Sequence, residues 1–323
     1  MMYLVTGAAG FIGYHVCKRL LEEGEIVVGV DNLNDYYSVE LKLARLSNLR
    51  NFAQFAFFKI DIADRQAVER LFQEHKFEKV IHLAAQAGVR YSIDNPYAYA
   101  DSNLMGMLTI LEGCRHHKIK HLIYASSSSV YGMSDKVPFS EDDRVDNPVS
   151  FYAATKKANE AMVASYSNLY GLKCTGLRFF TVYGPWGRPD MAPMLFSNSL
   201  VNNNPIKIFN NGKMQRDFTY IDDIVKAVFR ISKVTSESNR HQVYNIGNGK
   251  PVDLLMFIKT LETKFNIKGK YKYLDMQNGD VTRTYADISK LESFIEWTPT
   301  TSVDEGVSKF VDWYTSYYGS TNK

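Results

Sequence analysis

Apolar and polar positions alternate along the first half of the chain in two recurring patterns. Short apolar runs predict buried strands, and segments with apolar residues three or four apart predict helices between them. The predicted strands are a run that begins at residue 3, then 26–31, 55–62, 79–85 and 121–126, and the helices include 40–49, 64–74 and 97–117. Strand and helix therefore alternate five times, which predicts an α/β fold with a doubly wound parallel sheet.

The alternation loosens after a sixth strand at 173–180. Helical spacing recurs at 194–201, 222–232, 254–265, 289–294 and 303–317, with an extended stretch at 205–209. The segment 242–247 is apolar enough to return to the main sheet as another strand. We expect residues 1–180 to form a Rossmann-like nucleotide-binding domain, with a returning segment near 222–248. Residues 181–323 would form mainly a smaller α/β domain that binds the substrate.

Composition narrows the function classes. The 323 residues are 45% hydrophobic, with a formal net charge of +3, and no basic run interleaves with aromatic residues. Nucleic acid is therefore not indicated as a partner. The apolar runs are short and interrupted by charge, and the first residues lead directly into a strand, so we expect no membrane segment and a cytoplasmic location.

The first strand ends in a glycine pattern that indicates a dinucleotide cradle. Gly7, Gly10 and Gly13 are spaced three apart and lead into a helical pattern, with Phe11 and Ile12 between the last two. Glycines allow the backbone to approach a pyrophosphate, and the helix N-terminus supplies unpaired N–H groups. A purely structural glycine turn is the alternative.

The second strand ends at Asp31, where a carboxylate can accept hydrogen bonds from a ribose. It would repel a 2′-phosphate, and no arginine or lysine immediately follows it, so NAD is favoured over NADP. The alternative is an aspartate that only caps the turn.

Tyr152 and Lys156 stand four apart where a helix opens, downstream of the serine run 126–129 that ends the fifth strand. Residues four apart share a helix face. A nearby ammonium favours the phenolate of a tyrosine, which makes Tyr152 a candidate base, and a serine hydroxyl could bind the same substrate oxygen. The alternative is an exposed helical pair.

Other titratable residues are expected to be structural. His82 has apolar neighbours, and His116 and His117 end a predicted helix, where they would be solvated. No residue spacing indicates a metal site. Cys17, Cys114 and Cys174 are predicted to be buried, reduced thiols.

Several motifs together resemble the extended short-chain dehydrogenase/reductase family. They are the glycine pattern, Asp61-Ile62, Leu83-Ala84-Ala85, Asn103, Ser127, Tyr152-x-x-x-Lys156, Arg178-Phe-Phe-Thr-Val-Tyr-Gly-Pro185 and Arg216-Asp-Phe-Thr-Tyr-Ile-Asp-Asp223. Within that family, the segments 32–37, 179–181 and 184–192 look like those of the nucleotide-sugar 4-epimerases that act on UDP-glucuronate.

The resemblance assigns roles to these positions. It implies that Ser127, Tyr152 and Lys156 are catalytic, and that Lys156 also binds the nicotinamide ribose of NAD and lowers the tyrosine pKa. It implies a cofactor site formed by Gly7, Gly10, Phe11, Ile12, Gly13, Asp31, Asn32, Asp61, Ile62, Leu83, Ala84 and Ala85. Arg90, Phe209 and Arg216 lie where relatives hold the diphosphate and the uracil. Gln277 stands about where UDP-galactose epimerases carry an arginine.

The resemblance also separates sister activities. The 4,6-dehydratases carry an Asp-Glu pair directly after the catalytic hydroxyl and the UDP-glucuronate decarboxylases carry a Glu there, whereas this chain has Ser128-Ser129. What remains is reversible oxidation at C4, which predicts epimerisation of UDP-glucuronate to UDP-galacturonate. The 4-keto intermediate is a β-keto acid, and Ser126, Ser128 and Thr181 are candidates to hold its carboxylate, with Arg188 as an outer guard. Strand-end hydrogen bonding is the alternative for Ser126 and Ser129.

Two other functions remain open. One is a 4-epimerase of a neutral sugar, UDP-glucose or UDP-N-acetylglucosamine, and the other is a non-catalytic NAD-binding protein. The resemblance further implies a homodimer through the helices at about 97–117 and 150–170, and a role in polysaccharide biosynthesis.

Overall fold

The computed structural model describes residues 1–234, 240–276 and 281–319 and has two layers of helices around one large parallel sheet. Within these residues the sheet has seven strands in the order β10-β6-β5-β4-β1-β2-β3, all paired in parallel. The strands are β1 (Met2–Thr6), β2 (Ile26–Asp31), β3 (Phe55–Lys59), β4 (Lys79–His82), β5 (His121–Ser127), β6 (Cys174–Phe179) and β10 (His241–Ile246). The predicted doubly wound α/β fold is confirmed.

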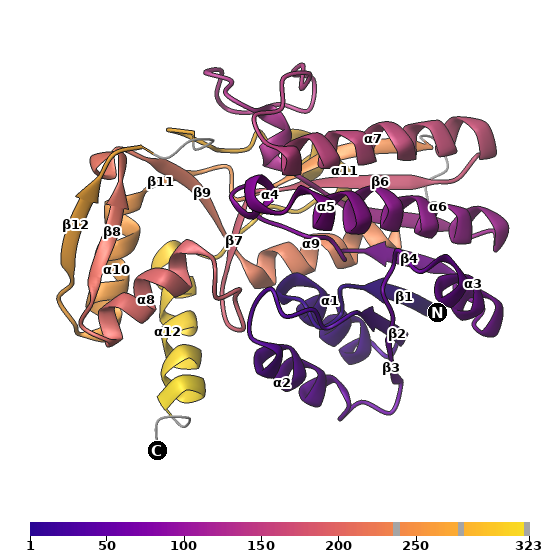
Figure 1. Ribbon diagram of the computed structural model, residues 1–323, viewed down its shortest axis with the longest axis horizontal. Coiled ribbons are helices and arrows are strands. Elements are labelled where there is room, and N and C mark those ends of the chain that lie inside the picture. The colour runs from indigo at the N-terminus through magenta and orange to yellow at the C-terminus, as the bar shows by residue number, and fades with distance from the viewer. Residues whose placement is uncertain (235–239, 277–280, 320–323) are drawn as a thin grey trace.

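Side chains of successive strand residues point to opposite faces of the sheet and pack on different helices. Tyr3 and Val5 join the core on the face covered by α1 and α9, whereas Leu4 joins the core on the other face, beneath α3, α6 and α7 (Figure 1). The helices are α1 (Phe11–Glu22), α2 (Val39–Leu49), α3 (Arg65–Glu74), α6 (Gly106–His116), α7 (Phe151–Tyr170) and α9 (Ile221–Lys233).

Helix boundaries follow capping chemistry. The Asp64 side chain accepts hydrogen bonds from the backbone N–H groups of Gln66 and Ala67 at the start of α3. Ser150 accepts from Ala153 N–H at the start of α7, which ends at Gly171 in the left-handed conformation. Side-chain acceptors satisfy the free N–H groups of a first turn, and glycine tolerates the left-handed C-terminal position. Capping by Ser150 therefore fixes the point at which α7 begins, one residue before Tyr152.

The helix predicted over 97–117 runs without a break as far as His116, but it is not α-helical throughout. It consists of α5 (Pro96–Tyr99), a π-helical stretch η1 (Ala100–Met105) and then α6, and a separate short helix, α4 (Tyr91–Asp94), precedes it. Asn103 lies inside the π-helical stretch, where its side chain accepts from Gln86 N–H at 2.9 Å and donates to Gln86 O and Thr155 Oγ1, both at 3.0 Å. Helical periodicity alone does not reveal this extra-wide turn, because these bonds reach a loop and a helix distant in sequence.

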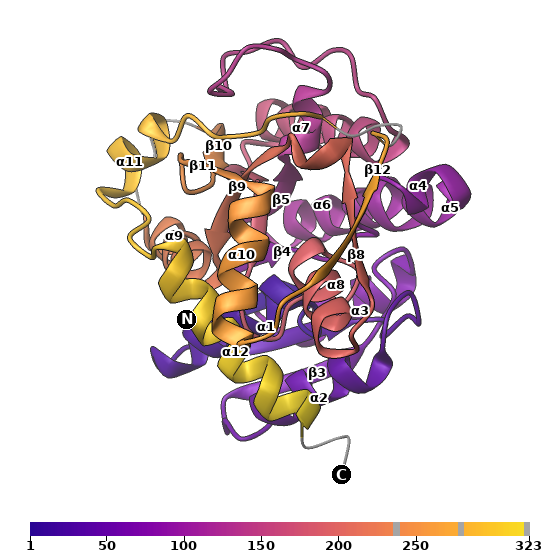
Figure 2. The same cartoon turned by 90° about the vertical axis from the view of Figure 1, so that its left-hand side faces the viewer.

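The remaining elements gather at one end of the sheet, at the left of Figure 1 and facing the viewer in Figure 2. A three-stranded sheet has the order β11-β9-β7, and β12 pairs with β8 in a separate ribbon. These elements are β7 (Thr181–Tyr183), α8 (Ala192–Val201), β8 (Pro205–Phe209), η3 (Asn210–Gly212), β9 (Gln215–Tyr220), β11 (Pro251–Asp253), α10 (Leu254–Phe265), β12 (Lys270–Leu274) and α12 (Val303–Gly319). Two further elements belong to the main sheet: η2 (Ser128–Tyr131) directly follows β5, and α11 (Ser289–Ile295) packs on β10 and α9.

The chain passes between the two groups of elements more than once. After β7 it returns through α9, which packs on α1, and through β10, which pairs with β6 at the edge of the main sheet. The chain therefore does not pass from one group to the other at a single residue. The domain boundary at residue 180 stays a prediction. No helix in the described ranges is both long and apolar enough to span a bilayer.

Candidate active site

The glycine turn between β1 and α1 is packed too closely for side chains. A Cβ atom on Gly13 would lie 2.0 Å from the carbonyl oxygen of Gly7, and one on Gly7 would lie 2.8 Å from the backbone nitrogen of Ala84. Gly7 also has a φ of +73°, in the region that favours glycine. Helix α1 begins after Gly10 without a side-chain cap. The free N–H groups and the dipole of α1 therefore form a site for an anionic group.

Asp31 lies directly beside this turn at the end of β2. Its carboxylate accepts a hydrogen bond from Ala9 N–H at 3.2 Å and another from Leu33 N–H at 2.9 Å. Asp61 follows β3 and accepts from the Asn32 side chain at 2.9 Å. Two neighbouring strand ends thus bring the predicted ribose and adenosine contacts together at one edge of the sheet.

Two cations missed by the sequence analysis approach Asp31. Burial raises the pKa of Asp31, and the charges of Lys42 and Arg45 on α2 oppose that rise. Lys42 donates to Asn34 Oδ1 at 2.9 Å, and Arg45 donates to Ala9 O at 2.8 Å. Lys42 and Arg45 follow Asp31 by more than ten residues. The fold of α2 brings them close to Asp31, and the spacing of nearby residues in the sequence does not reveal this.

The predicted catalytic residues lie together at the end of β5 and the start of α7. The Tyr152 hydroxyl lies within hydrogen-bonding reach of the Ser127 side chain, and the Tyr152 ring lies 6.0 Å from that of Tyr99. Lys156 follows one turn later on α7 and donates to Ala125 O on β5 at 2.8 Å. Tyr152 therefore does not belong to an exposed helical pair.

The pKa of Tyr152 differs from the sequence-based expectation. Burial raises it, and the hydrogen bond with Ser127 and the charge of Arg188 oppose that rise. Burial also lowers the pKa of Lys156 to about 8, because it disfavours the charged ammonium. In the protein by itself, burial therefore outweighs any lowering of the tyrosine pKa by Lys156.

The serine run divides into hydroxyls with different partners. Ser126 is buried and donates to Glu160 Oε1 at 2.6 Å, and Glu160 in turn binds Arg178. The Ser126 proton is thus directed at a buried carboxylate, which favours the alternative of a structural hydrogen bond at the end of the strand. Ser127 Oγ accepts from Ser129 N–H at 3.1 Å, which fixes the turn just after the catalytic position.

Arg90 and Phe209 converge although 119 positions separate them. The Arg90 guanidinium lies 5.4 Å from the centre of the Phe209 ring, which extends the edge of the site toward β8. Arg216 on β9 donates to Gln215 O at 2.9 Å. Thr181 begins β7, and Gln277 lies outside the described residues. The structure therefore brings Arg90 and Phe209 together, and their contact with the diphosphate and the uracil stays a prediction.

Arg188 lies near Tyr152 and is held from two sides. Its guanidinium forms an ion pair with Asp190 at 2.5 Å and donates to Ala87 O at 3.4 Å. Asp190 also accepts from the Tyr36 hydroxyl at 3.1 Å. The guanidinium charge lowers the pKa of Tyr152 against the effect of burial. The predicted outer guard is thus within electrostatic reach of the candidate base.

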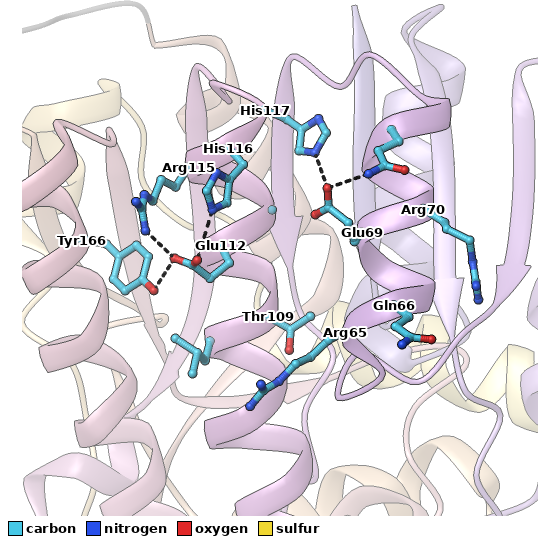
Figure 3. A pocket seen from close by; sticks show the side chains of 13 residues that line it. Arg65, Gln66, Glu69, Arg70, Thr109, Glu112, Arg115, His116, His117 and Tyr166 are labelled. Carbon is cyan, nitrogen blue, oxygen red and sulfur yellow. Dashed lines mark hydrogen bonds and ion pairs between the residues drawn. The ribbon is translucent and has the colours of Figure 1, made fainter.

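The histidine and the cysteines that were expected to be structural are engaged in the interior of the protein. His82 is buried and shares a 2.8 Å hydrogen bond with Thr6, and the three cysteines are buried and free. A large groove lies instead between α3 and α6 (Figure 3). Its carboxylates are already paired, Glu112 with Arg115 and His116, and Glu69 with His117. That groove therefore carries none of the catalytic chemistry described above.

Comparisons with known proteins agree with this geometry. The model of the NAD dependent epimerase/dehydratase family matches residues 3–247. An uncharacterised protein of Escherichia coli O111:H- is 55% identical, over 98% of this chain and 99% of that protein. A probable UDP-glucuronate 4-epimerase of Rhizobium meliloti is 46% identical over 98% of each chain. The crystal structure of UDP-glucuronic acid 4-epimerase from Bacillus cereus, in complex with UDP-glucuronic acid and NAD, superposes with a TM-score of 0.93 at 34% identity, covering 98% of this chain and all of that one.

Proposed function

The chain belongs to the NAD dependent epimerase/dehydratase family, and on that premise we propose that it interconverts UDP-glucuronate and UDP-galacturonate. The observation that carries the proposal is that Tyr152 and Lys156 of α7 meet Ser127 at the carboxyl end of β5, on the same edge of the parallel sheet as the glycine turn that follows β1. Full-length similarity to proteins described as UDP-glucuronate 4-epimerases supports the same substrate. A neutral UDP-sugar and a non-catalytic role receive less support from the same comparisons.

NAD fits the residues at the glycine turn. The uncapped N-terminus of α1 would bind the pyrophosphate, and Asp31 and Asp61 would bind the adenosine portion. When bound, NAD would accept a hydride from C4 of the sugar and return it to the opposite face. Gly7 and Gly13 leave the backbone of the turn accessible, because neither carries a Cβ that would fill it.

The side chains around the catalytic tyrosine would move and hold one proton. Tyr152 Oη would accept the proton of the 4′-hydroxyl, while Ser127 Oγ hydrogen-bonds the same substrate oxygen. Lys156 would add a positive charge next to this pair, favouring the phenolate form. After the 4-keto sugar turns about its phosphate linkage, Tyr152 would return the proton to the oxygen, so no atom is gained or lost overall.

A uronate must be protected against decarboxylation during the reaction, whereas a neutral sugar has no carboxylate to lose. Loss of CO2 from its 4-keto form, with uptake of a proton from water, would give a UDP-4-ketopentose. Return of the hydride to C4 and of a proton to the oxygen would then convert this ketone into a UDP-pentose. Ser128 directly follows the catalytic serine and Thr181 begins β7, so we propose that both hydroxyls hold the carboxylate by charge-assisted hydrogen bonds. Arg188 would stand outside them as a guard. The hydroxyl proton of Ser126 is donated to Glu160, so we assign Ser126 to the buried hydrogen-bond network of Glu160 and Arg178 rather than to the carboxylate of the substrate.

Replacing both Ser128 and Thr181 by alanine is expected to change the product. The carboxylate could then rotate until its C–C bond aligns with the ketone, so the fraction released as UDP-pentose should rise about tenfold or more while epimerisation falls. Chromatography of the nucleotide sugars measures both. Thr260→Ala, at a partly exposed threonine on α10, is the matched control. Unchanged products in the double variant would show that these hydroxyls do not hold the carboxylate.

The reaction itself is tested by a proton NMR time course with purified protein, UDP-glucuronate and no added NAD. Appearance of UDP-galacturonate would support the proposal and show that the cofactor remains bound, since it is regenerated in each cycle. A UDP-pentose as the main product would mean decarboxylation. No reaction after addition of NAD would direct the search to UDP-glucose and UDP-N-acetylglucosamine.

We further propose that the enzyme is a cytoplasmic homodimer that serves polysaccharide biosynthesis. The helices at about 97–117 and 150–170 would form the interface, and exposed apolar side chains at Tyr97 and Leu169 support this. Sedimentation equilibrium distinguishes a dimer from a monomer. Replacement of Leu169 by glutamate should weaken the dimer, because it would introduce a charge into the interface.

A further inference from the structure

Arg45 is a fully buried arginine that bridges two parts of the chain. One terminal nitrogen donates to Ala9 O at 2.8 Å and to the Tyr37 hydroxyl at 2.9 Å, and the other donates to Trp186 O at 2.6 Å and Gly187 O at 3.3 Å. Ala9 lies inside the glycine turn, whereas Trp186 and Gly187 lie in the loop just before Arg188. A single side chain therefore connects the candidate cofactor turn with the loop that carries the guard.

His15 supports the same loop from helix α1. Its Nε2 lies 2.9 Å from Pro185 O. A carbonyl oxygen can only accept, so Nε2 must carry the proton and donate it. Burial lowers the pKa of His15 to about 3, and the nearby charges of Arg45 and Lys18 act in the same direction, so the ring stays neutral at physiological pH. Arg45 and His15 together bind three consecutive carbonyl groups, those of residues 185–187.

The loop is also fixed by its own ring contacts. Trp186 has a φ of +62°, in the left-handed region that bulky residues rarely adopt. Its ring packs against Tyr14 at 5.7 Å, Trp313 at 5.5 Å and Tyr317 at 5.1 Å between ring centres. Surrounding contacts must hold a residue in such a conformation, and the Arg45 hydrogen bond to its carbonyl is one of them.

The charge of Arg45 links this loop to the cofactor turn. Its four acceptors are neutral oxygens, so among the described residues its guanidinium has no contacting carboxylate. Asp31 is close enough for the two charges to interact, but it does not bond to Arg45. A pyrophosphate at the glycine turn would add negative charge on the Ala9 side of the guanidinium. It would therefore hold Arg45 more firmly in its bridging position.

We propose that Arg45 and His15 form a buried clamp that holds the 184–190 loop against the glycine turn and positions Arg188. Both are positioning residues, because they act through the loop rather than on the substrate. The proposed consequence for the product rests on the proposed function, whereas the clamp and its response to NAD do not. Loop order should accordingly increase when NAD binds, although the loop lies outside the glycine turn.

Hydrogen–deuterium exchange of nucleotide-stripped protein, with and without added NAD, tests the coupling directly. NAD should slow exchange in peptides covering 7–13 and also in those covering 184–190 in the unaltered protein. Arg45→Lys keeps the charge but lacks the fork that reaches both sides, so the slowing at 184–190 should disappear while that at 7–13 remains. Arg50→Lys, at the exposed end of the same helix, is the matched control. Equal slowing at 184–190 in Arg45→Lys would overturn the clamp.

A second pair of variants keeps the test valid if Arg45→Lys does not fold. His15→Leu removes the donor to Pro185, whereas His15→Gln restores an N–H donor. We expect exchange in 184–190 to be about tenfold faster in His15→Leu and close to the unaltered rate in His15→Gln. Identical exchange in the two variants would contradict the role of His15.

The two proposals fail in different ways. If the unaltered protein binds NAD but forms no UDP-galacturonate, the proposed function fails while the exchange results still decide the clamp. If it epimerises normally, Arg45→Lys and His15→Leu should each release a larger fraction of UDP-pentose, because Arg188 is displaced. An unchanged pentose fraction together with altered exchange would overturn the claim that the clamp positions Arg188.

Discussion

Tyr152→Phe is expected to lower kcat for UDP-glucuronate epimerisation by roughly 10³-fold, the range expected for losing a positioned general base. The substitution removes only the hydroxyl that is hydrogen-bonded to Ser127 and leaves the ring beside Tyr99. The dissociation constant for UDP-glucuronate, measured by calorimetry, should therefore change little. Tyr273→Phe, on the exposed strand β12, removes an equivalent hydroxyl far from the site and should leave kcat unchanged.

The same variant should lose the pH dependence of the reaction. Proton abstraction requires the phenolate, and the fraction of phenolate rises with pH up to the pKa of Tyr152. Burial raises that pKa in the protein alone, and a positively charged nicotinamide nearby would lower it. The activity of the unaltered enzyme should therefore rise with pH, whereas the residual activity of Tyr152→Phe should not show this rise. If Tyr152→Phe kept a tenth of the activity together with the rise with pH, another residue would be the base.

Local patterns in the sequence predicted most of the strands, turns and helices that carry the candidate site residues. A strand, glycine turn and helix are specified by neighbouring residues, so the positions of Gly7, Gly10 and Gly13 could be predicted from spacing alone. Parallel strands carry their carboxyl ends to one edge of a sheet, which predicted that Asp31 and Ser127 lie along that edge. The position of Tyr152 also follows from local chemistry, since Ser150 caps the helix on which it lies.

The missed features depend on contacts between residues far apart in the sequence. Arg45 binds carbonyls more than 140 positions away, and no periodicity distinguishes it from an arginine on a solvated helix face. Ser126 and Ser128 were both candidates to hold the carboxylate, and the hydrogen bond of Ser126 to Glu160 on α7 is what separates them. The π-helical turn at Asn103 likewise depends on partners at Gln86 and Thr155.

Glu160→Gln is expected to destabilise the protein by about 3–5 kcal/mol, because it leaves the buried charge of Arg178 without its partner. Glu160 lies on α7 and binds Arg178 on β6 through two bonds of 2.8 and 2.9 Å. Both side chains are almost fully buried, at 7% and 5% exposure. Such a loss is a large part of the stability of an ordinary domain. The shift in the urea midpoint at unchanged slope measures it.

The exposed pair of Glu305 and Lys309 on α12 provides the control, since its members are 54% and 47% exposed. Glu305→Gln should cost no more than about 0.5 kcal/mol, because water screens a surface pair. A loss below about 1 kcal/mol in Glu160→Gln would show that the buried pair contributes little.

The Glu160 contribution should also depend on pH in a defined direction. Burial alone would raise the pKa of Glu160, but the Arg178 guanidinium and the Ser126 hydroxyl outweigh burial and lower it below its ordinary 4.5. A carboxylate with a lowered folded-state pKa stabilises the protein fully above its unfolded-state value and loses that effect as pH falls through the folded-state value. The stability difference between unaltered protein and Glu160→Gln should therefore be constant near pH 7 and shrink below about pH 4.

Glu160→Gln should also lower kcat at pH 7, because Ser126 binds Glu160 and directly precedes Ser127. An unchanged kcat in folded Glu160→Gln would mean that the buried pair stabilises β5 without positioning Ser127.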